Sequence, residues 1–306
     1  MVEPIQPIIK PGRLNPGDII GIAAPAGPYA QDEFEKGIAA IRELGFQVKI
    51  PENLQRPQSF LAGSDDHRAD LLEALFKDPE VDAIICARGG YGSLRILERL
   101  DYDMIRRHPK TFMGFSDISA LHASLITRAG LVVFHGPMII SLGKSSAETR
   151  ASLLEALTLD RPIEIHPSKP NQLCPGVASG IVQGGNLATL CHLLGTPFTP
   201  LYKNTILVLE DITETPYKID RMLYQMKLAG CFAGVNGVVL GSFQESGSYR
   251  EICDIVGEIF RDLKVPVLAG FEIGHSHENV TIPLGIRATL DTEEGSLRFH
   301  EPATSL

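Results

Sequence analysis

A serine offers the most distinctive chemistry in this chain. Ser116 lies in MGFSDI (residues 113–118), where an apolar strand is expected to end and a helix to begin. Such a junction is typical of a nucleophile elbow, which lifts the serine Oγ to the sheet edge, beside backbone N–H groups that can stabilise an oxyanion. The match to G-x-S-x-G is partial, because Ile118 replaces the second glycine. Taken alone, the segment favours a simpler interpretation, in which Ser116 or Asp117 caps a helix.

A glycine-rich turn, ARGGYGS at residues 87–93, also separates an expected strand from a helix. Its glycines allow a ligand to approach the backbone closely. One interpretation is a phosphate loop, although the third glycine of G-x-G-x-x-G and a Walker lysine are both missing. A second is an oxyanion donor, with the Arg88 guanidinium binding a carboxylate. A third is an ordinary tight turn that Arg88 holds in place.

Carboxylates follow an apolar strand in ILVLED (residues 206–211), and Glu214 comes shortly after. Carboxylates in this position border a site about as often as they lie in a solvated turn. The residues alone therefore leave the roles of Glu210, Asp211 and Glu214 open.

Two histidines stand close together in GHSHEN (residues 274–279). A metal site would need further ligands, and the sequence has no H-E-x-x-H or comparable cluster. We therefore expect no metal and no other cofactor. One histidine as a general base with the other exposed is one interpretation, and two histidines in a polar loop is the alternative.

Alternation of apolar and amphipathic segments indicates which elements position these residues. In the first half, expected strands alternate with expected helices, which predicts parallel strands joined by helical crossovers. This is a doubly wound, flavodoxin-like or Rossmann-like α/β domain, in which ligands bind at the carboxyl ends of the strands. The expected strands are 19–25, 46–50, 81–87, 111–115 and 131–135, and the expected helices are 32–44, 65–76 and 94–100, with another directly after residue 115.

The amino-acid composition changes near residue 160, where the segment DRPIEIHPSKPNQLCPG is rich in proline and polar residues. We predict an N-terminal α/β domain over 1–160, a linker over 161–179 and a smaller β-rich α+β domain over 180–306. The last domain should end in a hairpin around a Glu-Glu-Gly turn. Its expected strands are 180–183, 206–210, 237–243, 266–273, 280–290 and 296–300, and its expected helices are 186–194, 216–229 and 249–263.

Composition excludes several classes of protein. The net charge is −9 and no Lys or Arg run is present, so a nucleic-acid binder is not expected. With 44% hydrophobic and 21% charged residues, the chain is globular rather than disordered. The proline-rich start does not resemble a signal peptide, and no apolar stretch is long enough for a membrane span. The five cysteines are odd in number and scattered, which favours a reducing cytoplasm.

Several segments in order resemble the LD-carboxypeptidases (muramoyltetrapeptide carboxypeptidases), serine peptidases of cell-wall recycling. The resemblance covers almost the whole chain, and the ordered set is far more specific than any one motif. The segments are AAPAG (23–27), ARGGYG (87–92), GFSD (114–117), FHGPM (134–138), GGNLATL (184–190), LVLEDITETPYKIDRML (207–223) and GHSHENVTIPLG (274–285).

The resemblance implies that Ser116 is the nucleophile, Glu210 the acid and His275 the base of a triad assembled from both domains. Strand parity agrees with this, because Glu210 shares a face with Val208 while Asp211 points the opposite way. We further expect the backbone N–H groups of Gly90 and Asp117 to form the oxyanion hole.

The reaction implied is removal of the terminal D-alanine from a cytoplasmic murein tetrapeptide or muropeptide in peptidoglycan recycling, by a homodimer. Arg88 is a candidate for binding the substrate carboxylate. A relative group cleaves peptide–nucleotide antibiotics of the microcin C type and carries a tryptophan that can stack on a base. This chain has no Trp, which favours the murein enzyme. A non-catalytic α/β anion-binding protein is the alternative from a different class.

Overall fold

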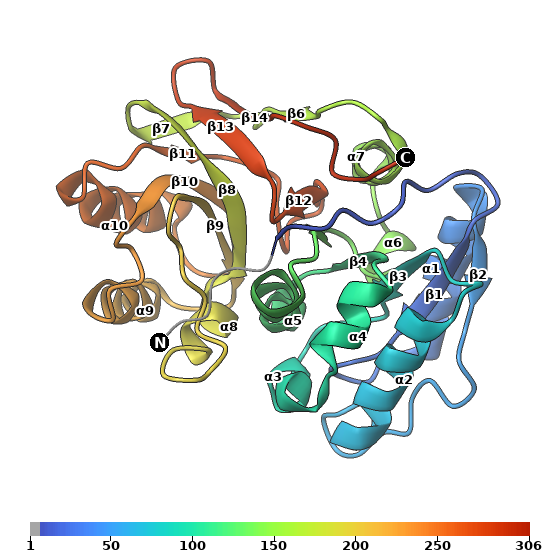
Figure 1. Ribbon diagram of the computed structural model, residues 1–306. Helices are drawn as coiled ribbons and strands as arrows, with labels where there is room; N and C mark the ends of the chain where they lie inside the picture. Colours follow the sequence, from blue (N-terminus) through green and yellow to red (C-terminus); the bar gives the residue numbers. More distant parts are fainter. Residues whose placement is uncertain (1–6) are drawn as a thin grey trace.

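The first part of the protein is built on a six-stranded sheet (Figure 1). The computed structural model describes residues 7–306. The strand order is β12-β5-β4-β3-β1-β2, and β12 runs antiparallel to β5 while the other neighbours run parallel. The predicted mostly parallel sheet is therefore confirmed. Its strands are β1 (Ile19–Ala23), β2 (Gln47–Lys49), β3 (Ala83–Cys86), β4 (Thr111–Gly114), β5 (Val133–His135) and β12 (Ile282–Leu284).

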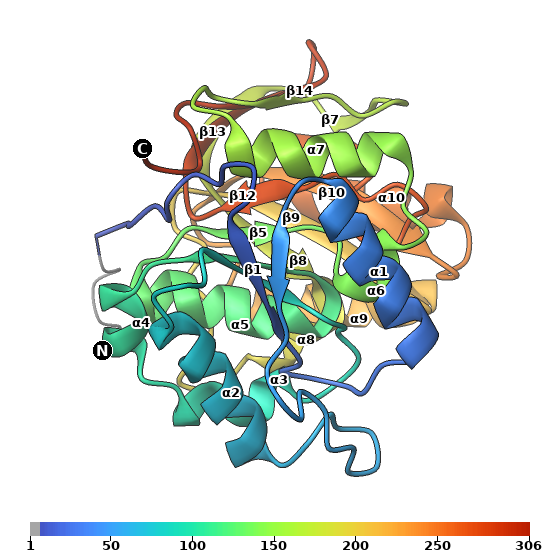
Figure 2. The ribbon, with the colours of Figure 1, turned by 90° about the vertical axis from the view of Figure 1, so that its right-hand side faces the viewer.

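Helices cover both faces of this sheet, which explains why β3 is apolar and why β3 and β4 are buried along their whole length. Figure 2 shows α1 and α6 on one face and α2 to α5 on the other. The α-helices are α1 (Gln31–Glu43), α2 (Asp65–Lys77), α3 (Ser93–Ile96), α4 (Tyr102–Arg107), α5 (Ser119–Ser124), α6 (Ile139–Leu142) and α7 (Ala147–Thr158), and the other helical turns are η1 (Leu97–Arg99), η2 (Ser116–Ile118) and η3 (Leu125–Ala129).

The second part is built on an eight-stranded sheet with the order β6-β14-β13-β8-β9-β10-β11-β7. Its centre, β8 to β11, is parallel, and the remaining pairs are antiparallel. The predicted hairpin is the pair β13–β14. The strands are β6 (Glu164–Ile165), β7 (Asn171–Cys174), β8 (Val177–Asn186), β9 (Thr205–Ile212), β10 (Val235–Gln244), β11 (Val267–Ala269), β13 (Arg287–Asp291) and β14 (Ser296–Phe299).

Three helices follow strands of this sheet: α8 (Leu187–His192), α9 (Pro216–Leu228) and α10 (Tyr249–Asp262). In α10 the buried residues Ile252, Val256 and Phe260 recur at helical spacing, so the helix presents one apolar face to the sheet. Pro216 stands in the first turn of α9, where its missing N–H leaves no bond unmade.

Two segments differ from their predicted roles. The expected linker contributes β6 and β7, which pair at the two outer edges of the second sheet. The expected strand 280–290 is interrupted at Gly285, whose φ of 99° turns the backbone. As a result β12 joins the first sheet and β13 the second, so the chain crosses back between the two parts.

The two parts meet along α5, which packs against β8 and α8 (Figure 1). Ser119 at the start of α5 accepts a hydrogen bond from the backbone N–H of Asn186 at 3.0 Å. A Cβ on Gly185 would lie 2.4 Å from the Ser119 Oγ, so only glycine allows this approach. The carboxyl ends of β4 and β8 are thereby brought together.

The structure adds one observation on membrane-spanning helices and one on the cysteines. Within residues 7–306, none of the helices combines the length and apolar character that a bilayer crossing requires. All five cysteines are free and buried.

Candidate active site

Ser116 occupies a strained turn between β4 and η2. Its φ is 64°, in the left-handed region that non-glycine residues seldom adopt. A Cβ on Gly89 would lie 3.0 Å from the Ser116 Cβ and 3.3 Å from its Oγ. The glycine-rich loop after β3 therefore lies directly beside the serine, and a side chain at position 89 would crowd the hydroxyl. This geometry is that of a nucleophile elbow.

Glu210 and His275 form a buried pair on the second sheet. The His275 Nδ1 and the Glu210 Oε2 are 2.7 Å apart. Glu210 lies in β9 with a fully buried side chain, and His275 follows β11 with 14% of its side chain exposed. A Cβ on Gly274 would lie 2.3 Å from the Glu210 Oε2, and its φ is 106°, so glycine is needed here for both space and conformation.

Burial and pairing act in opposite directions on these two groups. Burial opposes the charged imidazolium, but the hydrogen bond and charge of Glu210 outweigh it, so the pKa of His275 is raised above its ordinary value. Burial also opposes the Glu210 carboxylate, yet the His135 and His275 imidazoles facing it hold the pKa of Glu210 below its usual value. Glu210 is thus ionised and His275 is a strengthened base.

An aromatic contact joins the serine turn to the histidine loop. The rings of Phe115 and His275 meet edge to face with centroids 4.8 Å apart. Ser116 follows Phe115 directly, so the hydroxyl and the imidazole lie on neighbouring segments. Among the described residues, no hydrogen bond joins the Ser116 Oγ to the imidazole; such catalytic bonds are often long without substrate and tighten when it binds.

The neighbouring carboxylates are engaged elsewhere. Asp211 points to the opposite face of β9, where it accepts hydrogen bonds from the Asn186 side chain and the Ala188 N–H, both at 2.9 Å. Burial, followed by the charge of Glu210, raises the pKa of Asp211 to about 6. Glu214 lies beyond the strand and pairs with Lys218 at 3.3 Å. The structure thus brings Glu210, and neither of the others, to His275.

The two residues predicted for the oxyanion hole flank the serine. Gly90 follows Gly89 in the loop, with φ at 96°, and Asp117 follows Ser116 at the start of η2. N–H groups in the first turn of a helix have no intrahelical acceptor. The Asp117 side chain accepts the backbone N–H of Ser93 at 2.8 Å, which ties the serine turn to the start of α3.

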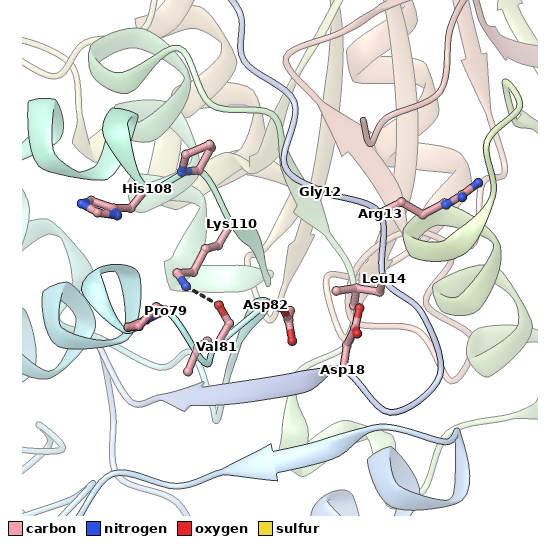
Figure 3. A pocket seen from close by; sticks show the side chains of 10 residues that line it. Gly12, Arg13, Leu14, Asp18, Pro79, Val81, Asp82, His108 and Lys110 are labelled. Carbon is pink, nitrogen blue, oxygen red and sulfur yellow. Dashed lines mark hydrogen bonds between the residues drawn. The ribbon is translucent and has the colours of Figure 1, made fainter. Parts of the chain in front are cut away.

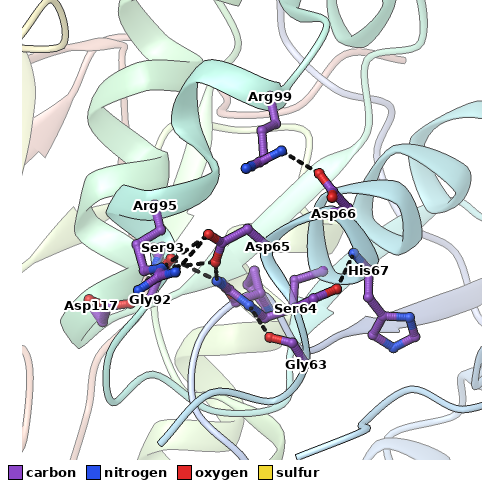
Figure 4. Close-up of polar contacts among 12 residues, drawn as sticks. Gly63, Ser64, Asp65, Asp66, His67, Gly92, Ser93, Arg95, Arg99 and Asp117 are labelled. Carbon is purple, nitrogen blue, oxygen red and sulfur yellow. Dashed lines mark hydrogen bonds and ion pairs between the residues drawn. The ribbon is translucent and has the colours of Figure 1, made fainter. Parts of the chain in front are cut away.

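A buried arginine that sequence reasoning missed supports the same loop, and Figure 4 shows three of its partners, Gly63, Asp65 and Gly92. Arg68 in α2 is 1% exposed and donates to the carbonyls of Gly63, Pro25 and Gly92 and to the Asp65 carboxylate. The loops after β1, before α2 and after β3 are thereby held on one guanidinium. A lone arginine within a charged helical turn gave no signal in the sequence.

The remaining candidates are more exposed. Arg88 is exposed and donates to the Pro28 carbonyl at 2.6 Å, which ties two loops at the carboxyl edge of the sheet. His277 is also exposed. Among residues 7–306, no three His, Cys, Asp or Glu side chains cluster as a metal site would need.

Of the cavities among the described residues, one lies at the amino ends of strands and another at the carboxyl ends. One of about 280 Å³, lined by Asp18, Asp82 and Lys110 among others (Figure 3), lies at the amino ends of β1, β3 and β4, whereas Ser116 follows the carboxyl end of β4. The other, of about 630 Å³, lies at the carboxyl ends of β10 and β11 and reaches Ser276, next to His275. The second cavity therefore borders the candidate active site.

A serine on a strained elbow, close to a buried carboxylate–imidazole pair, is the arrangement found in serine hydrolases. Comparison with known proteins narrows this class. The sequence matches the LD-carboxypeptidase N-terminal domain over residues 20–136 and the LD-carboxypeptidase C-terminal domain over residues 179–290. The protein therefore belongs to the LD-carboxypeptidase family and is a serine-type carboxypeptidase.

Similar proteins span nearly the whole chain. A probable murein peptide carboxypeptidase of Bacillus subtilis is 38% identical over 296 residues, covering 93% of this chain and 92% of that one. A murein tetrapeptide carboxypeptidase of Pseudomonas aeruginosa is 30% identical over 287 residues, covering 89% and 92%. The crystal structure of an MccF-like protein from Bacillus anthracis has a TM-score of 0.89 and 31% identity, covering 95% and 99%.

Proposed function

We propose that this carboxypeptidase removes the terminal D-alanine from cytoplasmic murein tetrapeptides in peptidoglycan recycling, through a Ser116–His275–Glu210 triad. The observation that carries the proposal is the 2.7 Å contact between the His275 Nδ1 and the Glu210 Oε2, next to the Ser116 elbow. The names of the similar proteins supply the substrate class. A homodimer is part of the proposal and follows from the family resemblance alone.

In this mechanism the Ser116 Oγ attacks the carbonyl that joins the L-centre of the diamino acid to D-alanine. The His275 Nε2 accepts the serine proton, while Glu210 holds Nδ1–H and stabilises the imidazolium that forms. The N–H groups of Gly90 and Asp117 bind the developing oxyanion. His275 then protonates the leaving amine of D-alanine.

Water then hydrolyses the acyl-enzyme with the help of the same catalytic groups. His275 takes a proton from the water, the hydroxide adds to the ester carbonyl of Ser116, and the serine leaves with a proton from His275. Arg88 is our candidate for the D-alanine carboxylate, because one guanidinium nitrogen is bound to Pro28 and the fork has further donors.

Incubation with murein tetrapeptide, followed by mass spectrometry, tests the proposal. We expect the tripeptide and free alanine from the wild-type protein and none from Ser116→Ala. A peptide that ends in L-alanine should not be cleaved. The C-terminal amide of the tetrapeptide should react slowly with the wild-type protein, and Arg88→Ala should slow that reaction no further. If only peptide–nucleotide conjugates are cleaved, the antibiotic-immunity alternative is correct. If nothing is cleaved and Ser116 resists a fluorophosphonate, the protein is the non-catalytic binder.

A further inference from the structure

A second histidine faces the candidate triad acid from the first sheet. His135 ends β5, in register with Gly114 of β4 and Ile282 of β12, and its side chain is fully buried. In the described part of the chain, neither of its ring nitrogens has a hydrogen-bond partner. Its Nε2 is 3.9 Å from the Glu210 Oε1.

One carboxylate oxygen of Glu210 has a hydrogen-bond partner, and the other has none among the described residues. Oε2 is bound to His275, whereas Oε1 is buried and has no hydrogen-bond partner among the described residues. A buried carboxylate oxygen without a donor is strongly disfavoured. A shift of about 1 Å in either side chain brings Nε2 and Oε1 to the usual hydrogen-bond distance of about 2.9 Å.

The rings and backbone packed around His135 make no hydrogen bond to its side chain among the described residues. Its ring packs against Phe115 and against His122 of α5, with centroids 5.9 Å and 6.3 Å away, and lies close to Gly185 of β8. His122 is itself fully buried, and burial lowers its pKa well below the ordinary value, so it adds no charge. In the described part of the chain the carboxylate that faces this ring is that of Glu210, and Asp211 faces away toward α8.

We infer that His135 is a positioning residue of the triad: its Nε2–H donates to the Glu210 Oε1 and thereby keeps Oε2 on the His275 Nδ1. This rests on the proposed function, because it presupposes the Ser116–His275–Glu210 triad. The arrangement places one histidine on each oxygen of a single carboxylate, and the two histidines come from different parts of the fold.

Loss of the His135 donor should shift the pH dependence of the reaction in a predictable direction. Without it, the carboxylate is less stabilised as an anion, so the Glu210–His275 pair holds its proton more tightly. The pair must be free of that proton for His275 to act as a base. The acid limb of the pH–rate profile therefore moves to higher pH, by about one unit, and the rate falls by about 10–100-fold. A cavity or a loosened core would instead lower the rate equally at every pH.

The test measures how fast a fluorophosphonate labels Ser116 between pH 5 and 9. The key variants are His135→Phe, which keeps a ring without a donor, His135→Gln, whose amide reaches the position of Nε2, and His135→Asn, whose amide stops near Nδ1. His122→Phe is the matched control, since it replaces an equally buried imidazole that does not face Glu210. Thermal unfolding confirms that each variant is folded.

We expect the acid limb to shift in the Phe and Asn variants and to stay near its wild-type position in the Gln variant and in His122→Phe. An unshifted limb with a near-wild-type rate in His135→Phe overturns the inference. If the Phe variant does not fold, the Gln–Asn comparison decides, and equal behaviour of those two overturns it. A wild-type protein that is not labelled at Ser116 refutes the proposed function instead, so the two failures are distinguishable.

Discussion

Gly274→Ala should disable the enzyme without removing any catalytic atom. The new Cβ would lie 2.3 Å from the Glu210 Oε2, whereas carbon and oxygen atoms in contact normally stay more than about 3.2 Å apart. The carboxylate must therefore move by about 1 Å. That movement lengthens the present 2.7 Å contact with the His275 Nδ1 beyond hydrogen-bond range.

The expected loss follows from this displacement. A misplacement of about 1 Å near reacting groups lowers a rate by about 10²-fold, and complete loss of a triad acid lowers kcat by about 10⁴-fold. We expect kcat of Gly274→Ala to fall between these values while KM changes little. The assay is release of alanine from murein tetrapeptide, with fluorophosphonate labelling of Ser116 as a second readout.

Gly17→Ala is the matched control. Gly17 has a φ of 94°, close to the 106° of Gly274, but a Cβ there meets nothing within 4 Å. Both substitutions carry the backbone strain of about 1–2 kcal/mol, and only one of them crowds Glu210. If Gly274→Ala works within about twofold of the control, the clash is relieved without moving the carboxylate, and our account of this pair is refuted.

Four further results are expected. Ser116→Ala should lower hydrolysis by about 10⁴–10⁶-fold with folding intact, and retained activity would remove Ser116 as the nucleophile. Glu210→Gln should lower kcat by about 10³–10⁴-fold while Glu214→Gln keeps most activity, and the reverse order would make Glu214 the acid. Gly90→Val should slow turnover by about 10²–10³-fold, so normal kinetics would exclude its N–H from the oxyanion hole. Because the pKa of His275 is raised and its neutral form is the base, kcat/KM should fall as the pH drops through a value above the ordinary histidine pKa of about 6.5; an acid limb below that value would contradict this.

Strong periodic segments made much of the fold predictable. β3 is a continuous apolar run, β9 contains the apolar run Ile206–Leu209, and α10 repeats its apolar residues at helical spacing, so each lies where the sequence places it. The opposite directions of Glu210 and Asp211 also follow from the period of a strand. In these cases the local pattern and the tertiary structure agree.

Features that depend on distant partners were not predictable. β6 and β7 are short edge strands between prolines, and they are strands only because β14 and β11 offer them an open edge. Arg68 and His135 are ordinary residues in their own segments. Their roles arise from loops and strands that the fold brings to them, and no local pattern records those contacts.

The return of β12 to the first sheet has a consequence for the order in which the sheet and the candidate site form during synthesis. The nucleophile sheet lacks its last strand until residue 284 has been made, and the histidine loop lies only a few residues before that strand. A nascent chain carrying Ser116 and Glu210 thus has neither His275, the base of the proposed triad, nor a completed edge. The pairing of His275 with Glu210 and the closure of this sheet edge therefore both wait for the same late segment of the chain.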